Sequence, residues 1–352
     1  MKTQLETFLD NYDEKRWFTA IEKLLPAIHD VDKNAVQIWF RFFPLELFRY
    51  LQSAEDKEKA IQKFVMQGNY ELKNQIDSSH EFLYGHRFWT ATKAEIQRRA
   101  ESFDNDNKQN NEIADLSGLI EQIAQTVAGK SKVDKSLTTG IAAVALMTLV
   151  QVGFEDFKNA KGEIEKPKGL LTKSPDQIVK ERLKDDSQGI LGFLKSIDKK
   201  FTVTYDETTS NAKFQIIYDE ELATGSARNQ SKNWKEMDER CWEGVIPVEC
   251  RSAACGTCWV GILDGEEKLS EVSRLERKQM KVFGYNQPAE AKPFLRLACQ
   301  AKAYGNTTVV IPPWNGVFGK KIYGVEDVEL EPATTSAKKL RETVTDATKI
   351  SK

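Results

Sequence analysis

The sequence predicts a chain of two parts, an all-α region followed by a smaller α+β region. Three observations lead to this prediction. Apolar residues recur at intervals of three and four through residues 1 to about 125. Alternation typical of half-buried strands begins only near residue 200. Three of the five cysteines lie within residues 250–258, directly before an apolar segment that reads as a strand.

The composition is that of an ordinary globular protein. Of 352 residues, 40% are hydrophobic and 30% are charged, and the net charge is −2. A chain with this charge has no broad basic surface, so we expect no nucleic-acid partner. The N-terminal residues are charged and lack the apolar stretch of a secretory signal. We therefore expect a cytoplasmic protein, in which clustered cysteines more often bind metal or do redox chemistry than form disulfides.

Residues 1–130 are predicted to form an all-α helical domain. The segment "IWFRFFPLELFRYL" is dense in aromatic residues, among them Trp39, Phe42 and Phe48. Aromatic residues at helical spacing favour a buried helical core, and a groove that docks a partner is the alternative.

Residues 131–195 are predicted to hold an apolar helix and then a charged linker with one helix. Residues 137–154 carry no charge and contain several threonines and a glutamine. Because a membrane span needs about 20 predominantly apolar residues, we expect a helix buried in a bundle. Membrane contact through 137–154 is the alternative.

Residues 196–325 are predicted to form the α+β domain, and residues 326–352 a polar tail. The segments "KFTVTYDE", "AKFQIIYDE" and "TTVVIPP" have the alternation of strands. The segment "NWKEMDERCWEG", residues 233–244, reads as a helix that would carry Cys241.

The cysteine spacing predicts an iron–sulfur site. Cys250, Cys255 and Cys258 follow the order C-x4-C-x2-C, and Cys299 lies farther along, which is the plant-type [2Fe–2S] spacing. Two iron atoms need four thiolates, and small residues between them let backbone amides approach the sulfurs. A zinc site is the alternative, although structural zinc sites favour paired C-x2-C knuckles. Cys241 has no place in the pattern and is expected to be a small buried residue.

The segments "GVIPVECRSAACGTC" and "RLACQ" resemble the plant-type [2Fe–2S] ferredoxin family over residues 196–325. The resemblance implies a β-grasp fold, one [2Fe–2S] cluster as cofactor and metal ligation by Cys250, Cys255, Cys258 and Cys299. The chain departs from the family in having Ala253 where many members have glycine. It also has a longer gap before Cys299, expected as a surface excursion at 278–294, and a polar insert at 223–233.

These features predict a one-electron carrier rather than a catalytic enzyme, or the electron-transfer subunit of an oxidoreductase. Its partner would be a redox protein, either a reductase or an acceptor enzyme, docked through the helical N-terminal domain. The alternative function is an iron–sulfur redox sensor or regulatory adaptor. No G-x-G-x-x-G fingerprint for a nucleotide cofactor is present in the sequence.

Overall fold

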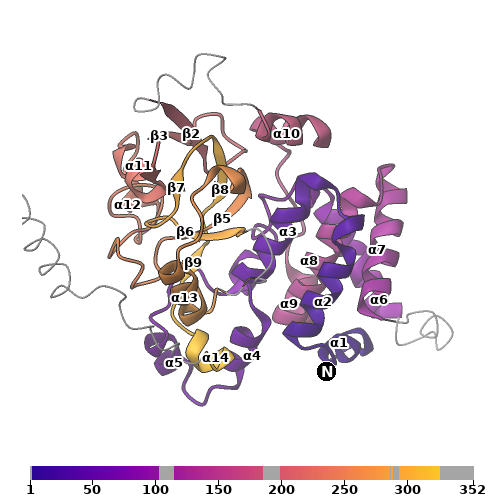
Figure 1. Ribbon diagram of the computed structural model, residues 1–352. Helices are drawn as coiled ribbons and strands as arrows, with labels where there is room; N and C mark the ends of the chain where they lie inside the picture. The colour runs from indigo at the N-terminus through magenta and orange to yellow at the C-terminus, as the bar shows by residue number, and fades with distance from the viewer. Residues whose placement is uncertain (1, 103–114, 185–198, 286, 288–292, 326–352) are drawn as a thin grey trace, which may run out of the picture.

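The computed structural model describes residues 2–102, 115–184, 199–285, 287 and 293–325. The predicted polar tail, 326–352, lies outside these residues. A helical region built from the first half of the chain packs beside a sheet region built from the second half (Figure 1). The architecture therefore follows the predicted order of an α region and then an α+β region.

The described part of the helical region consists of α-helices and short 3-10 turns. Several helices begin where the sequence supplies a side-chain cap: Thr3 and Ser174 each form a capping box, and the Asp13 and Asp115 carboxylates accept backbone amides. The helices are α1 (Gln4–Asp10), α2 (Glu14–Leu24), α3 (Asp30–Phe42), α4 (Leu45–Ser53), α5 (Lys57–Lys63), α6 (Trp89–Ser102), α7 (Leu116–Ser131), α8 (Ser136–Val152), α9 (Phe154–Asn159) and α10 (Pro175–Arg182). Short 3-10 turns lie at Leu25–Ala27, Leu72–Gln75, Tyr84–Phe88 and Gly169–Thr172.

Helix α8 is the centre of the helical region. Nearly all its side chains are buried, and it packs against α7, α6 and α3. Thr138 and Thr148 donate their hydroxyl protons to helix carbonyls, which satisfies these polar groups inside the core. Among the described residues no helix is both long and apolar enough to cross a bilayer. The uncharged segment is accounted for by burial within the bundle.

The sheet region contains a mixed five-stranded sheet in the order β3-β2-β8-β5-β6. Its strands are β2 (Lys200–Thr204), β3 (Lys213–Ile217), β5 (Trp259–Asp264), β6 (Leu295–Leu297) and β8 (Thr307–Val310). Strands β2 and β8 are parallel, and the other neighbours are antiparallel. A short pair joins β4 (Glu220–Glu221) to β7 (Lys302–Ala303). The three strands predicted from alternation are confirmed as β2, β3 and β8.

Three predictions about the segments around the sheet are wrong in detail. The predicted helix at 233–244 is helical only as α12 (Trp234–Met237), so Cys241 lies in irregular chain. The predicted insert at 223–233 begins with helix α11 (Leu222–Arg228), whose small residues pack against β3. The predicted excursion at 278–294 begins within helix α13 (Arg274–Phe283) and runs on to a fully buried tyrosine, Tyr285, while residues 286 and 288–292 of it lie outside the described residues. Each of these segments gains tertiary contacts that a local pattern does not reveal.

The helical and sheet regions share one hydrophobic core. Helix α3 lies across β5, and Gly261 permits this approach because a Cβ at that position would lie 2.5 Å from a methyl group of Ile38. The helical region also contributes strand β1 (Gln67–Gly68), which pairs with β9 (Trp314–Asn315). The Trp314 indole donates to the Phe42 carbonyl at 2.6 Å. The two regions are thus joined by main-chain pairing as well as by apolar contact.

Helix α10 provides a second connection between the regions. The Arg182 guanidinium makes two hydrogen bonds to the Glu207 carboxylate, at 2.8 and 2.7 Å, and one to the Val31 carbonyl at 2.9 Å. Both charged side chains are almost fully buried. Since a buried charge is tolerated only when it is paired, this ion pair fixes α10 between α3 and the turn that follows β2.

Candidate metal centre

The segment that carries three of the predicted ligands runs from the end of the irregular chain after α12 into β5. Cys250, Cys255 and Cys258 lie on this loop, and Cys299 lies in the turn that follows β6. Backbone pairing brings the two parts together, since the Ala298 amide donates to the Cys258 carbonyl at 2.8 Å.

The loop follows an unusual backbone path. Arg251 has φ 54°, Ala253 has φ 58° and Gly256 has φ 75°. Left-handed residues interspersed along a loop turn successive amides toward its concave side. Ala253 thus occupies a conformation that costs a residue with a Cβ about 1–2 kcal/mol. The departure noted in the sequence at this position does have a backbone consequence.

The structure brings the four predicted thiols together as two contacting pairs. The Cys255 thiol donates to the Cys250 sulfur, and the Cys258 thiol donates to the Cys299 sulfur. Cys255 also lies close enough to Cys258 for their charges to interact.

Backbone amides approach the sulfur atoms from the loop. The Ala254 amide lies 3.3 Å and the Ser252 amide 3.5 Å from the Cys250 sulfur. The Ala253 amide donates to the Cys299 sulfur. Amide donors of this kind stabilise negative charge on sulfur and on a cluster bound to it. The strained residue Ala253 therefore delivers one of the hydrogen bonds to the sulfurs.

The thiols differ in acidity because their surroundings differ. Partial burial raises the pKa of Cys250, but the Ser252 amide and the Cys255 thiol outweigh it and bring that pKa down to about 7. Donation by the Cys258 thiol lowers the pKa of Cys299 to about 6, against the opposing effect of burial. The same contact, together with burial, raises the pKa of Cys258. Each pair thus contains one thiol that ionises readily near neutral pH, which is the form that binds metal.

The pairing fits two metal atoms better than one. A single zinc ion needs three or four protein ligands around one point. Within the part of the chain that the structure describes, no group of three or more His, Cys, Asp or Glu side chains is placed to hold a single ion. Two pairs of thiols are instead the donor set that two iron atoms require. The residues present therefore fit a binuclear cluster.

Aromatic side chains behind the loop hold it against the sheet. The Tyr285 hydroxyl donates to the carbonyls of Gly256 and Gly316, and its ring stacks on Trp259 with 3.8 Å between centroids. The Phe283 ring packs so closely on Gly256 that a Cβ added there would lie 2.9 Å from a ring carbon. Sequence reasoning missed Tyr285 because it lies in the segment expected to be a surface excursion.

A buried ion pair supports the turn that carries Cys299. Arg296 and Glu276 are almost fully buried, and their side chains make hydrogen bonds of 2.9 and 3.0 Å. Glu276 also accepts the Leu297 amide at 2.8 Å, so α13 fixes strand β6 just before the turn. The arginine was visible in "RLACQ", but no pattern in the sequence indicated its partner on a helix about twenty residues earlier.

Cys241 stands apart from the four thiols, as expected. It is 4% exposed, and its thiol donates to the Val245 carbonyl at 3.2 Å. Burial raises its pKa to about 12. The burial predicted for Cys241 is therefore confirmed, and the partner of its thiol is a backbone carbonyl.

Comparison with known proteins agrees with this donor set. Residues 229–304 match the family model of the 2Fe-2S iron-sulfur cluster binding domain. The match includes all four cysteines and β5, but it covers less than a quarter of the chain and leaves out β2, β3 and the helical region. No solved structure matches the chain. The C-terminal part of this protein therefore contains a [2Fe–2S] ferredoxin-type domain, with a [2Fe–2S] cluster as its cofactor.

Proposed function

We propose that this protein is a one-electron carrier with a single [2Fe–2S] cluster held by Cys250, Cys255, Cys258 and Cys299. The observation that carries the proposal is the arrangement of these thiols as two contacting pairs, with backbone amides directed at the sulfurs. When bound, such a cluster accepts and returns one electron, at about −400 mV in plant-type domains.

The protein's own residues would set where that electron can go. Cys258 and Cys299 are 2% and 6% exposed, whereas Cys250 and Cys255 are half-buried. Arg251, Ser252 and Ala254 between them are exposed. One side of the site is thus shielded by the sheet region, and the other is thinly covered by loop backbone. A redox partner would approach from the thinly covered side.

The strand order supports a β-grasp fold for the cluster domain. A mixed sheet with a parallel central pair, β2 and β8, and a helix packed against it, α11, is the arrangement this fold requires. The order also gives a role to residues 200–228, which the family match does not include. They supply two strands and the helix that complete the sheet region.

We further propose that the helical region docks the cluster domain to a dedicated redox partner, a reductase or an acceptor enzyme. The shared core supports this role, because a partner bound to the helical region would then hold the cluster in a fixed position. Next to the loop, Trp242 is 64% exposed, and the Glu243 carboxylate that follows it pairs with Arg251. Exposed tryptophan is enriched at interfaces. The five cysteines form no disulfide, which suits a cytoplasmic location.

Spectroscopy on anaerobically purified protein tests the carrier function. We expect two iron and two sulfide per chain, a visible chromophore that bleaches with dithionite, and a rhombic S = 1/2 EPR signal that returns reversibly over repeated cycles. Zinc in place of iron, with no chromophore, would contradict the proposal. If the cluster cannot be reduced and reoxidised without unfolding the domain, its role is structural.

The sensor alternative predicts a different result. There, oxidation of the cluster would change the surface that the helical region presents to a partner. Hydrogen exchange on oxidised and reduced protein separates the two functions. We expect the carrier to show changes confined to residues around 250–258, whereas changed protection in α3 to α5 would favour the sensor.

A further inference from the structure

A cavity of about 260 Å³ lies in the helical region beside strand β9. It is bounded by α4, the end of α8 and the chain between β1 and the turn at Leu72–Gln75. Much of its wall is aromatic: Phe42, Phe43, Phe48, Tyr70 and Trp314. Aromatic walls favour a flat ring, because stacked or edge-on rings gain more than their buried area alone.

The cavity is close to the cysteine loop. Trp259 directly follows Cys258, and its ring lies 5.0 Å from the Phe42 ring and 5.7 Å from the Trp314 ring, between centroids. Both Phe42 and Trp314 also line the cavity. Only one layer of side chains thus separates the cavity from the residue that follows a predicted cluster ligand.

One polar side chain on the wall of the cavity is almost fully buried. Gln151, at the end of α8, is 4% exposed and lines the cavity. Its amide Nε2 donates to the Phe43 carbonyl at 2.7 Å. In the described residues, its Oε1 receives no hydrogen bond. This amide oxygen is therefore an acceptor that a ligand hydroxyl could use.

Two ion pairs lie at the solvent side of the cavity. Lys57 pairs with Glu71, and Lys73 pairs with Asp156, and all four side chains line the cavity. These pairs are substantially exposed, so each contributes little and can be opened by a ligand at small cost. The ammonium groups are hydrogen-bond donors for an oxygen at this end.

We propose that this cavity binds a quinone and its quinol. A ring with two opposite oxygens matches the site: aromatic side chains hold the ring, Gln151 accepts the quinol O–H inside, and Lys57 or Lys73 donates to the outer oxygen. On the proposed carrier function, on which this step rests, a quinone would gain two electrons in two successive one-electron transfers from a cluster held by the four cysteines. Two protons from water would complete the quinol, and the reductase proposed as redox partner would supply both electrons to the cluster.

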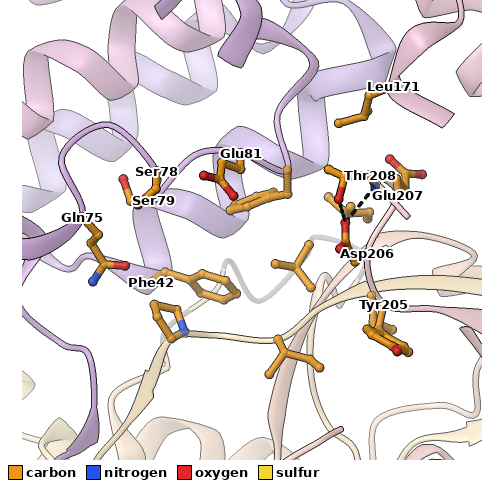
Figure 2. A pocket seen from close by; sticks show the side chains of 16 residues that line it. Phe42, Gln75, Ser78, Ser79, Glu81, Leu171, Tyr205, Asp206, Glu207 and Thr208 are labelled. Atoms are coloured by element: carbon orange, nitrogen blue, oxygen red, sulfur yellow. Dashed lines mark hydrogen bonds between the residues drawn. The ribbon is translucent and has the colours of Figure 1, made fainter. Parts of the chain in front are cut away.

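A neighbouring cavity does not fit the same ligand. It has about 270 Å³ and lies between the helical region and the sheet, with Phe42 on its wall (Figure 2). Its main polar groups already have partners: Asp206 accepts from Thr208, Glu207 pairs with Arg182, and Ser79 accepts from the Trp39 indole. The Tyr205 hydroxyl has no hydrogen-bond partner among the described residues, but its oxygen is fully buried and therefore closed to a ligand in this cavity.

Calorimetric titration of the oxidised holoprotein with duroquinone and with its quinol tests the proposal. Duroquinone is fully substituted and does not add to thiols. We expect saturable binding of both forms, and tighter binding of the quinol. Leu47→Phe, which adds bulk to the wall of the cavity, should weaken both affinities at least tenfold. Gln151→Leu should weaken quinol binding about tenfold and quinone binding less. Leu183→Phe, at an exposed position, is the matched control and should change neither.

Stopped-flow reoxidation gives a second readout. Reduced protein, freed of dithionite, should transfer electrons to duroquinone at a rate that saturates with quinone concentration, and Leu47→Phe should abolish the saturation. No binding by the unchanged protein, or equal affinities in Leu47→Phe with an unchanged near-UV spectrum, would overturn the proposal. If Leu47→Phe misfolds, the proposal is overturned when Gln151→Leu binds the quinol as tightly as the unchanged protein does. Binding does not require electron transfer, so a failed carrier function would appear separately as a missing EPR signal.

Discussion

In the helical region, α8 is enclosed by apolar side chains from α3, α6 and α7. In the cysteine loop, residues 250–258 are mostly small, and Arg251, Ser252 and Ala254 are exposed. The first part is held by burial of apolar surface. The second is held by contacts to sulfur, by the aromatic residues behind it and, when bound, by the cluster. Changes in the two places should therefore have separable effects on unfolding and on the cluster.

Removing one predicted ligand should have the largest effect. With the proposed ligand set, Cys299→Ala would remove one of the four thiolates, so we expect loss of the visible chromophore and of the EPR signal. Iron and sulfide counts check the result. Cys241→Ala is the matched control and should retain both, because Cys241 lies outside the two pairs. Retention of a full cluster in the Cys299 variant would remove this residue from the ligand set.

Breaking the buried ion pair behind the turn should destabilise the protein and weaken cluster retention together. Glu276→Ala leaves the Arg296 charge buried and the Leu297 amide without its acceptor. We expect a loss of about 3–5 kcal/mol in the free energy of unfolding, measured by anaerobic urea denaturation. Glu165→Ala, which removes an exposed ion pair with Lys168, should leave the urea midpoint unchanged.

Creating a cavity in the helical core by substitution should change the free energy of unfolding and leave the cluster unchanged. Leu146 on α8 is fully buried, and Leu146→Ala should lower the free energy of unfolding by about 2–5 kcal/mol. The EPR line shape should stay unchanged, because α8 packs mainly against the helices α3, α6, α7 and α9. A changed line shape would show that packing in the helical core affects the cluster, so that the two parts are not separable.

The junction between the regions should respond to pH. Burial raises the pKa of Asp264, at the end of β5, to about 6, against the opposing effect of the nearby Arg182 charge. The ordinary pKa of an aspartate is about 4. The folded protein therefore holds this proton more tightly than the unfolded chain, and stability from this group is lost as pH rises from about 4 to 6. Urea titrations at several pH values measure this effect, and Asp264→Asn should lose less stability than the unchanged protein between about pH 4 and 6. If the free energies of unfolding of the two proteins changed in parallel with pH, Asp264 would not be the group responsible.

The smallest effect is expected at Ala253. A glycine there removes the steric cost of φ 58°, although it also increases the entropy of the unfolded chain. We expect Ala253→Gly to raise the free energy of unfolding by no more than about 1 kcal/mol. Thermal melts of the holoprotein measure this change. A loss of stability would show that the buried methyl group contributes more by packing than the backbone loses by strain.

Local patterns predicted a good part of the molecule. The helical spacing of apolar residues and the alternation in β2, β3 and β8 could be predicted, because each depends on neighbours a few residues apart. The burial of Cys241 could be predicted from its residue type. The helix expected at 233–244 was mostly wrong. Its charged residues suit a helix, but Arg240 instead reaches the Pro312 carbonyl and Asn315 beside β9. Those partners lie more than seventy residues away.

The sequence by itself determined which thiols are the candidate ligands, since thiol chemistry and the C-x4-C-x2-C spacing do not depend on the rest of the fold. Only the tertiary structure decided how the thiols pair, that Tyr285 and Glu276 support their loop and turn, and that α3 covers β5. It also placed Gln151 and Trp314 on one cavity wall. The physical reason is that packing brings together residues that have no fixed separation along the chain, and burial then decides which polar groups need a partner.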